Sequence, residues 1–203
     1  MSEQSQFVTY QASVVLVSPS PIDPQSINPE TLKRVGIVKW ESIGGTVTPI
    51  FAETRHQNGI HIRTEGNRCV FQEQINEGLP LGYKVHKLAE RYADATKLLA
   101  YNALGINWES RMEAEDPNQW MSEKLVRNLR LAEFSPRSVQ MTKVIESTVI
   151  CNVTFSTRDE RVMASFNFHC QLSDSPEREP ASYLRRWREW QNHMESITQT
   201  LQK

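Results

Sequence analysis

Two histidines, His56 and His61, flank an Asn58-Gly59 pair, the commonest sequence of a two-residue β-hairpin turn. Such a turn would pair the two histidines across the hairpin, with their Cβ atoms about 4.5–5.5 Å apart, a spacing that suits two ligands of one metal ion. Zinc needs three or four ligands, and Glu65, the acid on the same face, lies too far along the strand to join them. We therefore expect no metal and no cofactor, and His56 and His61 remain only a candidate pair.

His169 and Cys170 place a potential base beside a potential nucleophile in the sequence. Adjacent residues of a strand point to opposite faces of the sheet, so these two side chains are not expected to meet. The chain has three cysteines, an odd number, and none of them shows CxxC spacing. We expect buried, unreactive thiols in a reducing compartment.

Catalytic and cofactor-binding motifs are absent from the sequence, including GxSxG, GxxxxGK[ST], GxGxxG and HExxH. Active sites are often assembled from distant residues, so an enzyme without a recognisable motif stays an alternative. No catalytic residue can be named, and a non-enzymatic function is the first expectation.

Charge is balanced over the chain, with 23 basic and 24 acidic residues and a net charge of −1. No global field therefore attracts nucleic acid or a membrane surface. A local cluster near the C-terminus is the basis of a nucleic-acid-binding alternative, because arginines beside exposed aromatic rings can bind phosphates and stack bases. The cluster comprises Arg178, Arg185, Arg186 and Arg188 with Trp187 and Trp190, and a second group comprises Lys124, Arg127 and Arg130. Acidic residues Glu177, Glu179 and Glu189 lie in the same C-terminal stretch and oppose this alternative.

An apolar stripe follows the C-terminal segment at heptad spacing, at Tyr183, Trp187, Trp190, Met194, Ile197 and Leu201. One alternative is that the stripe packs on the sheet of its own chain; the other is that part of it pairs with another chain. Large aromatic side chains are typical anchors of protein interfaces. We predict a partner-binding surface at Trp187, Trp190 and Met194, with Arg185 and Arg188, for a protein partner or for self-association.

Two hairpin-plus-helix passages must position these residues. The first runs from Thr46 through the Asn58-Gly59 turn to an amphipathic helix at 84–100, and the second runs from Ser138 to a helix at 180–203. Residues 149–155 and 162–172 alternate between apolar and polar, as in an antiparallel sheet with one packed and one wet face. The wet face should be polar and uncharged around Asn152, Thr154, Asn167 and His169.

The predicted fold class is α+β, with a mostly antiparallel sheet built from β-hairpins, packed against two long helices at 84–100 and 180–203 and against shorter helices. We expect a single domain over 1–203, in which 1–109 and 118–203 form two candidate pseudo-repeated halves. No secretory signal and no apolar run of about 18–20 residues is present, so we expect a cytoplasmic protein without a membrane span. The predicted function is that of a protein-binding or assembly module.

Overall fold

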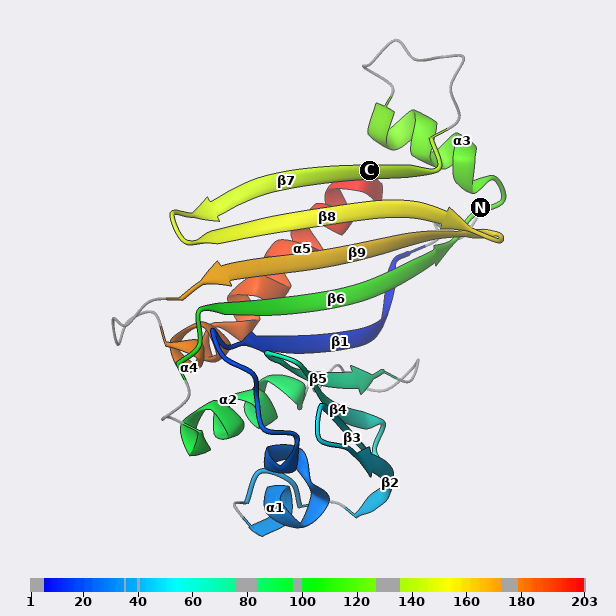
Figure 1. Cartoon of the computed structure of the whole chain (residues 1–203). Helices are drawn as coiled ribbons and strands as arrows, with labels where there is room; N and C mark the ends of the chain where they lie inside the picture. Colours follow the sequence, from blue (N-terminus) through cyan, green and yellow to red (C-terminus); the bar gives the residue numbers. More distant parts are fainter. Residues whose placement is uncertain are drawn as a thin grey trace.

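Nine antiparallel strands form one sheet in the order β2-β3-β4-β5-β1-β6-β9-β8-β7 (Figure 1). The computed structural model describes residues 6–34, 36–39, 41–75, 84–96, 100–126, 136–172 and 179–202. The predicted α+β class with a mostly antiparallel sheet is confirmed. The strands are β1 (Val8–Val17), β2 (Ser42–Val47), β3 (Phe51–His56), β4 (Ile60–Glu65), β5 (Arg68–Gln74), β6 (Ala103–Glu113), β7 (Ser138–Glu146), β8 (Val149–Arg158) and β9 (Arg161–Gln171).

The prediction of two long helices is not confirmed. Helix α2 spans Val85–Ala95, and residues 97–99 of the predicted helix lie outside the described residues. The C-terminal segment divides at Arg186, whose backbone N–H bonds to the Tyr183 carbonyl three residues earlier, giving α4 (Pro180–Arg185) and α5 (Trp187–Gln202). The shorter helical segments are η1 (Pro24–Ile27), α1 (Pro29–Arg34), α3 (Pro117–Met121) and the π-helical η2 (Ser122–Val126).

The hairpin between β3 and β4 has a register one residue different from the prediction. A two-residue type I′ turn needs positive φ at both Asn58 and Gly59, but only Gly59 has it, at 77°. The Gly59 N–H instead bonds to the His56 carbonyl at 3.2 Å, which makes a three-residue loop and pairs Arg55 with His61. His56 therefore faces the core and His61 the opposite side of the sheet. The predicted cross-strand histidine pair is wrong.

The hairpin between β8 and β9 has the predicted faces. Val149, Cys151, Val153 and Phe155 are buried together with the apolar residues of β9, while Asn152, Thr154 and Asn167 lie on the other face. A two-residue Asp159-Glu160 turn joins the strands, with φ of 54° at Asp159. All three cysteines, Cys69, Cys151 and Cys170, are free and buried, as expected.

The described helices that pack on the sheet cover one face, which we call the inner face. Helix α5 lies behind β6, β9, β8 and β7, and α2 packs on β1 and β5 (Figure 1). Alternate residues of every central strand fill the interior there, with Trp108, Phe166, Phe168 and Trp190 among the largest fully buried side chains. The opposite, outer face of β1, β6, β9, β8 and β7 carries no helix among the described residues.

Candidate functional site

A row of uncharged polar side chains crosses the outer face of five strands. Ser13, Asn107, Asn167, Asn152 and Thr142 are successive cross-strand neighbours on β1, β6, β9, β8 and β7. The Asn107 amide donates to the Ser13 hydroxyl at 3.2 Å, the Asn167 amide donates to Asn107 Oδ1, and the Thr142 hydroxyl donates to Asn152 Oδ1 at 2.9 Å. These bonds link Ser13, Asn107 and Asn167 in one chain and Thr142 with Asn152 in a second, and we call these five residues the polar row.

An apolar row lies beside the polar row on the same face. Its apolar members are Val15, Ile150 and Val144. Gly105, which has no side chain, and His169 lie between them, in the cross-strand order Val15, Gly105, His169, Ile150 and Val144. Ile150, on β8, is 38% exposed, and Val144, on the edge strand β7, is 67% exposed. Together the two rows form a mixed polar and apolar surface.

A hollow of about 540 Å³ lies where the two rows meet on β1, β6 and β9. Gly105 contributes no side chain to its floor, and Val15, Val17 and Ala103 line it with apolar groups. A Cβ built on Gly105 would lie 3.5 Å from the Asn167 amide nitrogen, an ordinary contact. A methyl group would therefore fit at this position, and glycine leaves that space open to the hollow.

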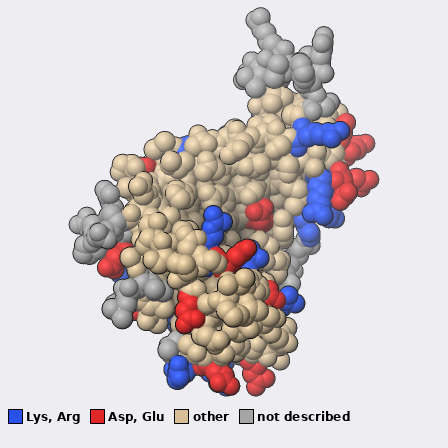
Figure 2. Space-filling view, viewed as in Figure 1, with Lys and Arg blue, Asp and Glu red and all other residues tan. Residues whose placement is uncertain are grey.

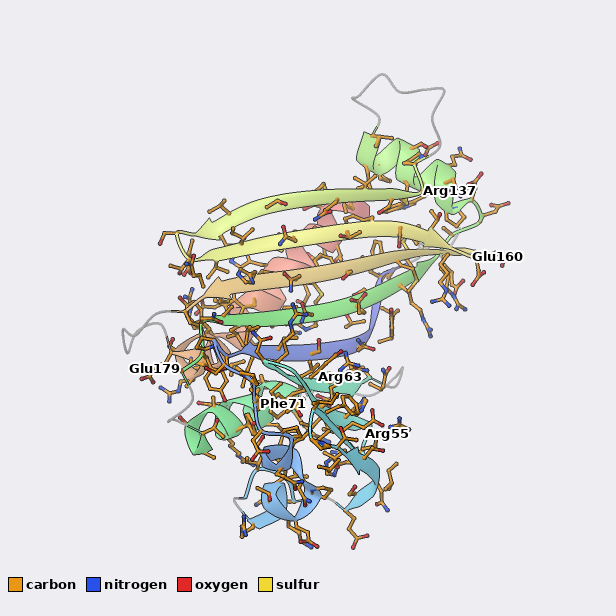
Figure 3. The ribbon with its side chains drawn as sticks, viewed as in Figure 1. Arg55, Arg63, Phe71, Arg137, Glu160 and Glu179 are labelled. Carbon is orange, nitrogen blue, oxygen red and sulfur yellow. The ribbon has the colours of Figure 1, made fainter. Side chains whose placement is uncertain are left out.

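Charged side chains are scarce on this face and gather at its ends. The surface over β7, β8, β9 and β6 is almost entirely uncharged, and charged residues collect at the right-hand end (Figure 2). Arg137 and Glu160 lie at that end of the strands (Figure 3). On the face itself, the Glu109 carboxylate accepts a hydrogen bond from the Ser165 hydroxyl at 2.9 Å, and burial raises the pKa of Glu109.

The predicted partner-binding side chains Trp187, Trp190 and Met194 lie on the inner face. Trp190 is fully buried against Phe168, with ring centroids 5.9 Å apart, and Trp187 packs against Trp108 at 4.7 Å. Met194 is buried on the same side of the helix. The apolar stripe thus packs on the sheet of its own chain, the first of the two alternatives.

The two predicted arginines, Arg185 of α4 and Arg188 of α5, are exposed. Arg185 pairs with Glu90 of α2 at 3.0 Å, an ion pair that joins α4 to α2. Of the remaining basic residues of the nucleic-acid alternative, Arg127, Arg130 and Arg178 lie outside the described residues. The arginine cluster is therefore partly neutralised where the structure describes it.

Arg186 joins the start of α5 to the end of β7. Its guanidinium bonds to the carboxylates of Glu146 and Glu189 and lies 4.5 Å from the centre of the Trp190 ring. The hydrogen bonds from Arg186 hold the pKa of Glu146 below its ordinary value of 4.5. The pair links the break between α4 and α5 to the end of β7.

This pair gives the stability a pH dependence that can be measured. A carboxylate whose pKa is lowered by folding stabilises the protein above its unfolded pKa, and this contribution is lost as the pH falls through the folded pKa. The difference in unfolding free energy between the wild type and Arg186→Met should therefore be constant above about pH 5 and shrink below it. Urea unfolding from pH 7 to pH 3 measures this difference; a difference independent of pH would contradict the role of the pair.

His56 and His61 form no site together. His56 is 3% exposed on the inner face, whereas His61 lies on the outer face 3.3 Å from Glu53. Burial lowers the pKa of His61, which favours the neutral ring. In the part of the chain that the structure describes, no group of three or more potential metal ligands lies close enough to hold an ion.

Comparison with protein-family models gives no match for this chain, and no curated protein matches it. Within the described residues, no helix has the length and apolar character needed to cross a membrane.

Sequence reasoning found Asn152, Asn167 and His169 on this face but missed Ser13, Thr142, Asn107 and Gly105. A signal for two of them was present: Gly105, Asn107 and Glu109 alternate with apolar Leu104, Ile106 and Trp108. This period-two pattern places Gly105 and Asn107 on one face of a strand.

Proposed function

We propose that the protein is a non-enzymatic protein-binding module that holds a segment of another polypeptide against the outer face. The observation that carries the proposal is the polar row beside the apolar row on a sheet face that no described helix covers. A solvated face of an antiparallel sheet needs neither exposed Val144 and Ile150 nor a hollow where β1 and β9 end and β6 begins. Both features have a use if another chain lies against this surface.

The polar row has the chemistry to bind peptide groups. An asparagine amide offers two N–H donors and an oxygen with two lone pairs, the same groups that a backbone presents. The described bonds within the row use one N–H of Asn107 and one N–H of Asn167. The ordered amides can therefore bond an incoming backbone without first losing a bond to each other.

The hollow supplies a place for an apolar side chain of the bound segment. Its volume of about 540 Å³ falls in the range of about 300–1,000 Å³ found for ligand sites. Val15, Val17 and Ala103 provide apolar contacts on one side, and the amides of Asn107 and Asn167 lie beside them. Arg68 of β5 also lines the hollow, so a bound segment with one apolar anchor can place a backbone carbonyl or a carboxylate beside this guanidinium.

The nucleic-acid alternative has less support from the geometry. Ion pairs of Arg185 with Glu90 and of Arg186 with Glu146 and Glu189 offset positive charge on the C-terminal helices. Trp187 and Trp190, whose rings were expected to stack on bases, are buried. We therefore retain protein binding as the proposal.

Substitution at Asn167 tests the proposal, because this residue lies at the centre of the polar row. Asn167→Lys adds a charge that a bound uncharged segment would desolvate, whereas Asn167→Thr keeps the position small, polar and uncharged. Each variant is immobilised, and proteins retained from an extract of the source cells are quantified by mass spectrometry. We expect the lysine variant to lose specific proteins that wild type and the threonine variant retain, with unchanged circular dichroism. Equal retention by all three would contradict binding at this row.

A further inference from the structure

We propose that strand β7 pairs antiparallel with β7 of a second copy of the chain, about a two-fold axis at Thr142. The pairing would join two nine-stranded sheets into one continuous sheet. It uses the backbone edge of β7 together with the side chains of Thr142 and Val144, and its test reads the oligomeric state, so it stands or fails separately from the proposed function.

The backbone of β7 is arranged to accept another strand. The Thr157 N–H bonds to the Arg137 carbonyl, so Arg137 and Thr157 form a hydrogen-bonded pair just before β7 begins. Hydrogen-bonded and non-hydrogen-bonded pairs alternate along an antiparallel ladder, and the register is regular from Ser138 to Val144. The N–H and C=O groups of Ser138, Gln140, Thr142 and Val144 therefore point away from β8, where no described strand lies.

The usual protections of an edge strand are weak at β7. Edges are commonly shortened, bulged, charged or interrupted by proline. Strand β7 is nine residues long, contains no proline, and is regular up to a register shift after Val144. Residues 140–144 are all exposed, and Lys143 is the single charged residue among them. The opposite edge strand, β2, has only six residues, two of them glycines, and a register shift near its start.

A two-fold axis at Thr142 is the register that the sequence of β7 favours. Thr142 is the central residue of Ser138–Glu146, so this axis pairs all nine residues with nine. It places Gln140 opposite Val144 of the second copy, and both carry backbone groups that point to the edge. An axis at Lys143 would place two like charges directly opposite each other, which is destabilising.

A second copy fits this edge better than an unrelated strand because the polar row ends there. Thr142 is the last residue of the row, and a Thr–Thr pair across the axis would continue it into the polar row of the second copy. Exposed Val144 and Met141 would gain cover from Gln140 and from the aliphatic part of Lys143 of the second copy.

Two double variants that differ in one residue test both the interface and its register. Gln140→Lys with Val144→Lys places like charges opposite each other twice in the dimer. Gln140→Lys with Val144→Glu places opposite charges there instead. Positions 140 and 144 both lie on an exposed stretch of β7, so both variants should fold alike. The mass of wild type and variants is measured by light scattering on a sizing column over a range of concentrations, against a chain mass of 23.4 kDa.

We expect wild type and the lysine–glutamate variant to run at twice the chain mass. The dissociation constant of the lysine–lysine dimer should be about tenfold or more above that of the wild-type dimer. Thr142→Pro, which removes an N–H that points to the edge and leaves the ladder to β8 intact, should also give a monomer with unchanged circular dichroism. A monomeric wild type would overturn the proposal. So would a dimer that all the variants retain, or one that both charge variants lose equally.

Discussion

Replacing Trp190 by alanine is expected to lower the free energy of unfolding by about 3–5 kcal/mol. The Trp190 side chain is fully buried between α5 and the sheet, against Phe168. Its indole N–H donates to the Tyr183 carbonyl at 3.0 Å, across the break between α4 and α5. The substitution removes this bond together with the ring, and a rigid sheet cannot collapse to fill the cavity.

Urea unfolding followed by circular dichroism measures this loss, with Arg188→Ala as the matched control on the same helix. Arg188 is exposed, so its replacement should change the stability by no more than about 0.5 kcal/mol. A Trp190→Ala variant as stable as this control would contradict the burial of the apolar stripe in its own chain.

Replacing Glu73 by alanine is expected to lower the free energy of unfolding by about 1–3 kcal/mol. Glu73 lies on the inner face of β5 and is 8% exposed. Its carboxylate accepts hydrogen bonds from the backbone N–H groups of Lys84 at 2.6 Å and Val85 at 3.2 Å, at the start of α2. The first N–H groups of a helix have no partner inside it, so Glu73 caps α2 from a neighbouring strand.

Glu73→Gln separates the acceptor from the charge. The glutamine amide oxygen can still accept from the helix N-terminus, so this variant should retain part of the stability that Glu73→Ala loses. The same urea titration compares the two. Equal losses would show that the capping bonds contribute nothing and that the charge alone accounts for the effect.

The sequence predicted the two faces of the β8–β9 hairpin because its alternation is long and uninterrupted. Over 149–172 a shift of one residue would expose six or more apolar side chains, so only one face assignment is possible. The β3–β4 hairpin was predicted one residue out of register. An Asn-Gly pair suits both a two-residue turn and a three-residue loop that ends in a glycine with positive φ. The hydrophobic pattern of the strands could distinguish the two loops, but Thr54 and Thr64 on the buried face weaken that pattern.

The spacing of the C-terminal stripe predicted which side chains share a face, but not what covers them. Packing of Trp187 and Trp190 on Trp108 and Phe168 depends on residues about 20–80 positions away. The ion pair of Arg186 with Glu146 at the end of β7 likewise joins residues 40 positions apart. Such contacts leave no local signal in the sequence.

The sequence predicts that some residues of the candidate site lie together, but not the others. Asn152 and Asn167 belong to one hairpin, so local alternation places them together. Ser13 and Asn107 join them through strand pairings between distant segments, β1 with β6 and β6 with β9, whereas Thr142 joins them through the β7–β8 hairpin. Gly105 matters only because of this pairing, since its missing side chain opens the hollow between Val15 and His169.

Site-specific photocrosslinking from the outer face tests the proposed function most directly. A benzoylphenylalanine replaces His169, an exposed residue on the rim of the hollow, and in a matched variant it replaces Arg91, an exposed residue of α2. Both proteins are irradiated in an extract of the source cells, and the adducts are identified by mass spectrometry. We predict a discrete polypeptide adduct from position 169 that is absent from position 91 and is lost when Asn167→Lys is added. Identical adducts from both positions, or none from position 169, would contradict a polypeptide-binding outer face.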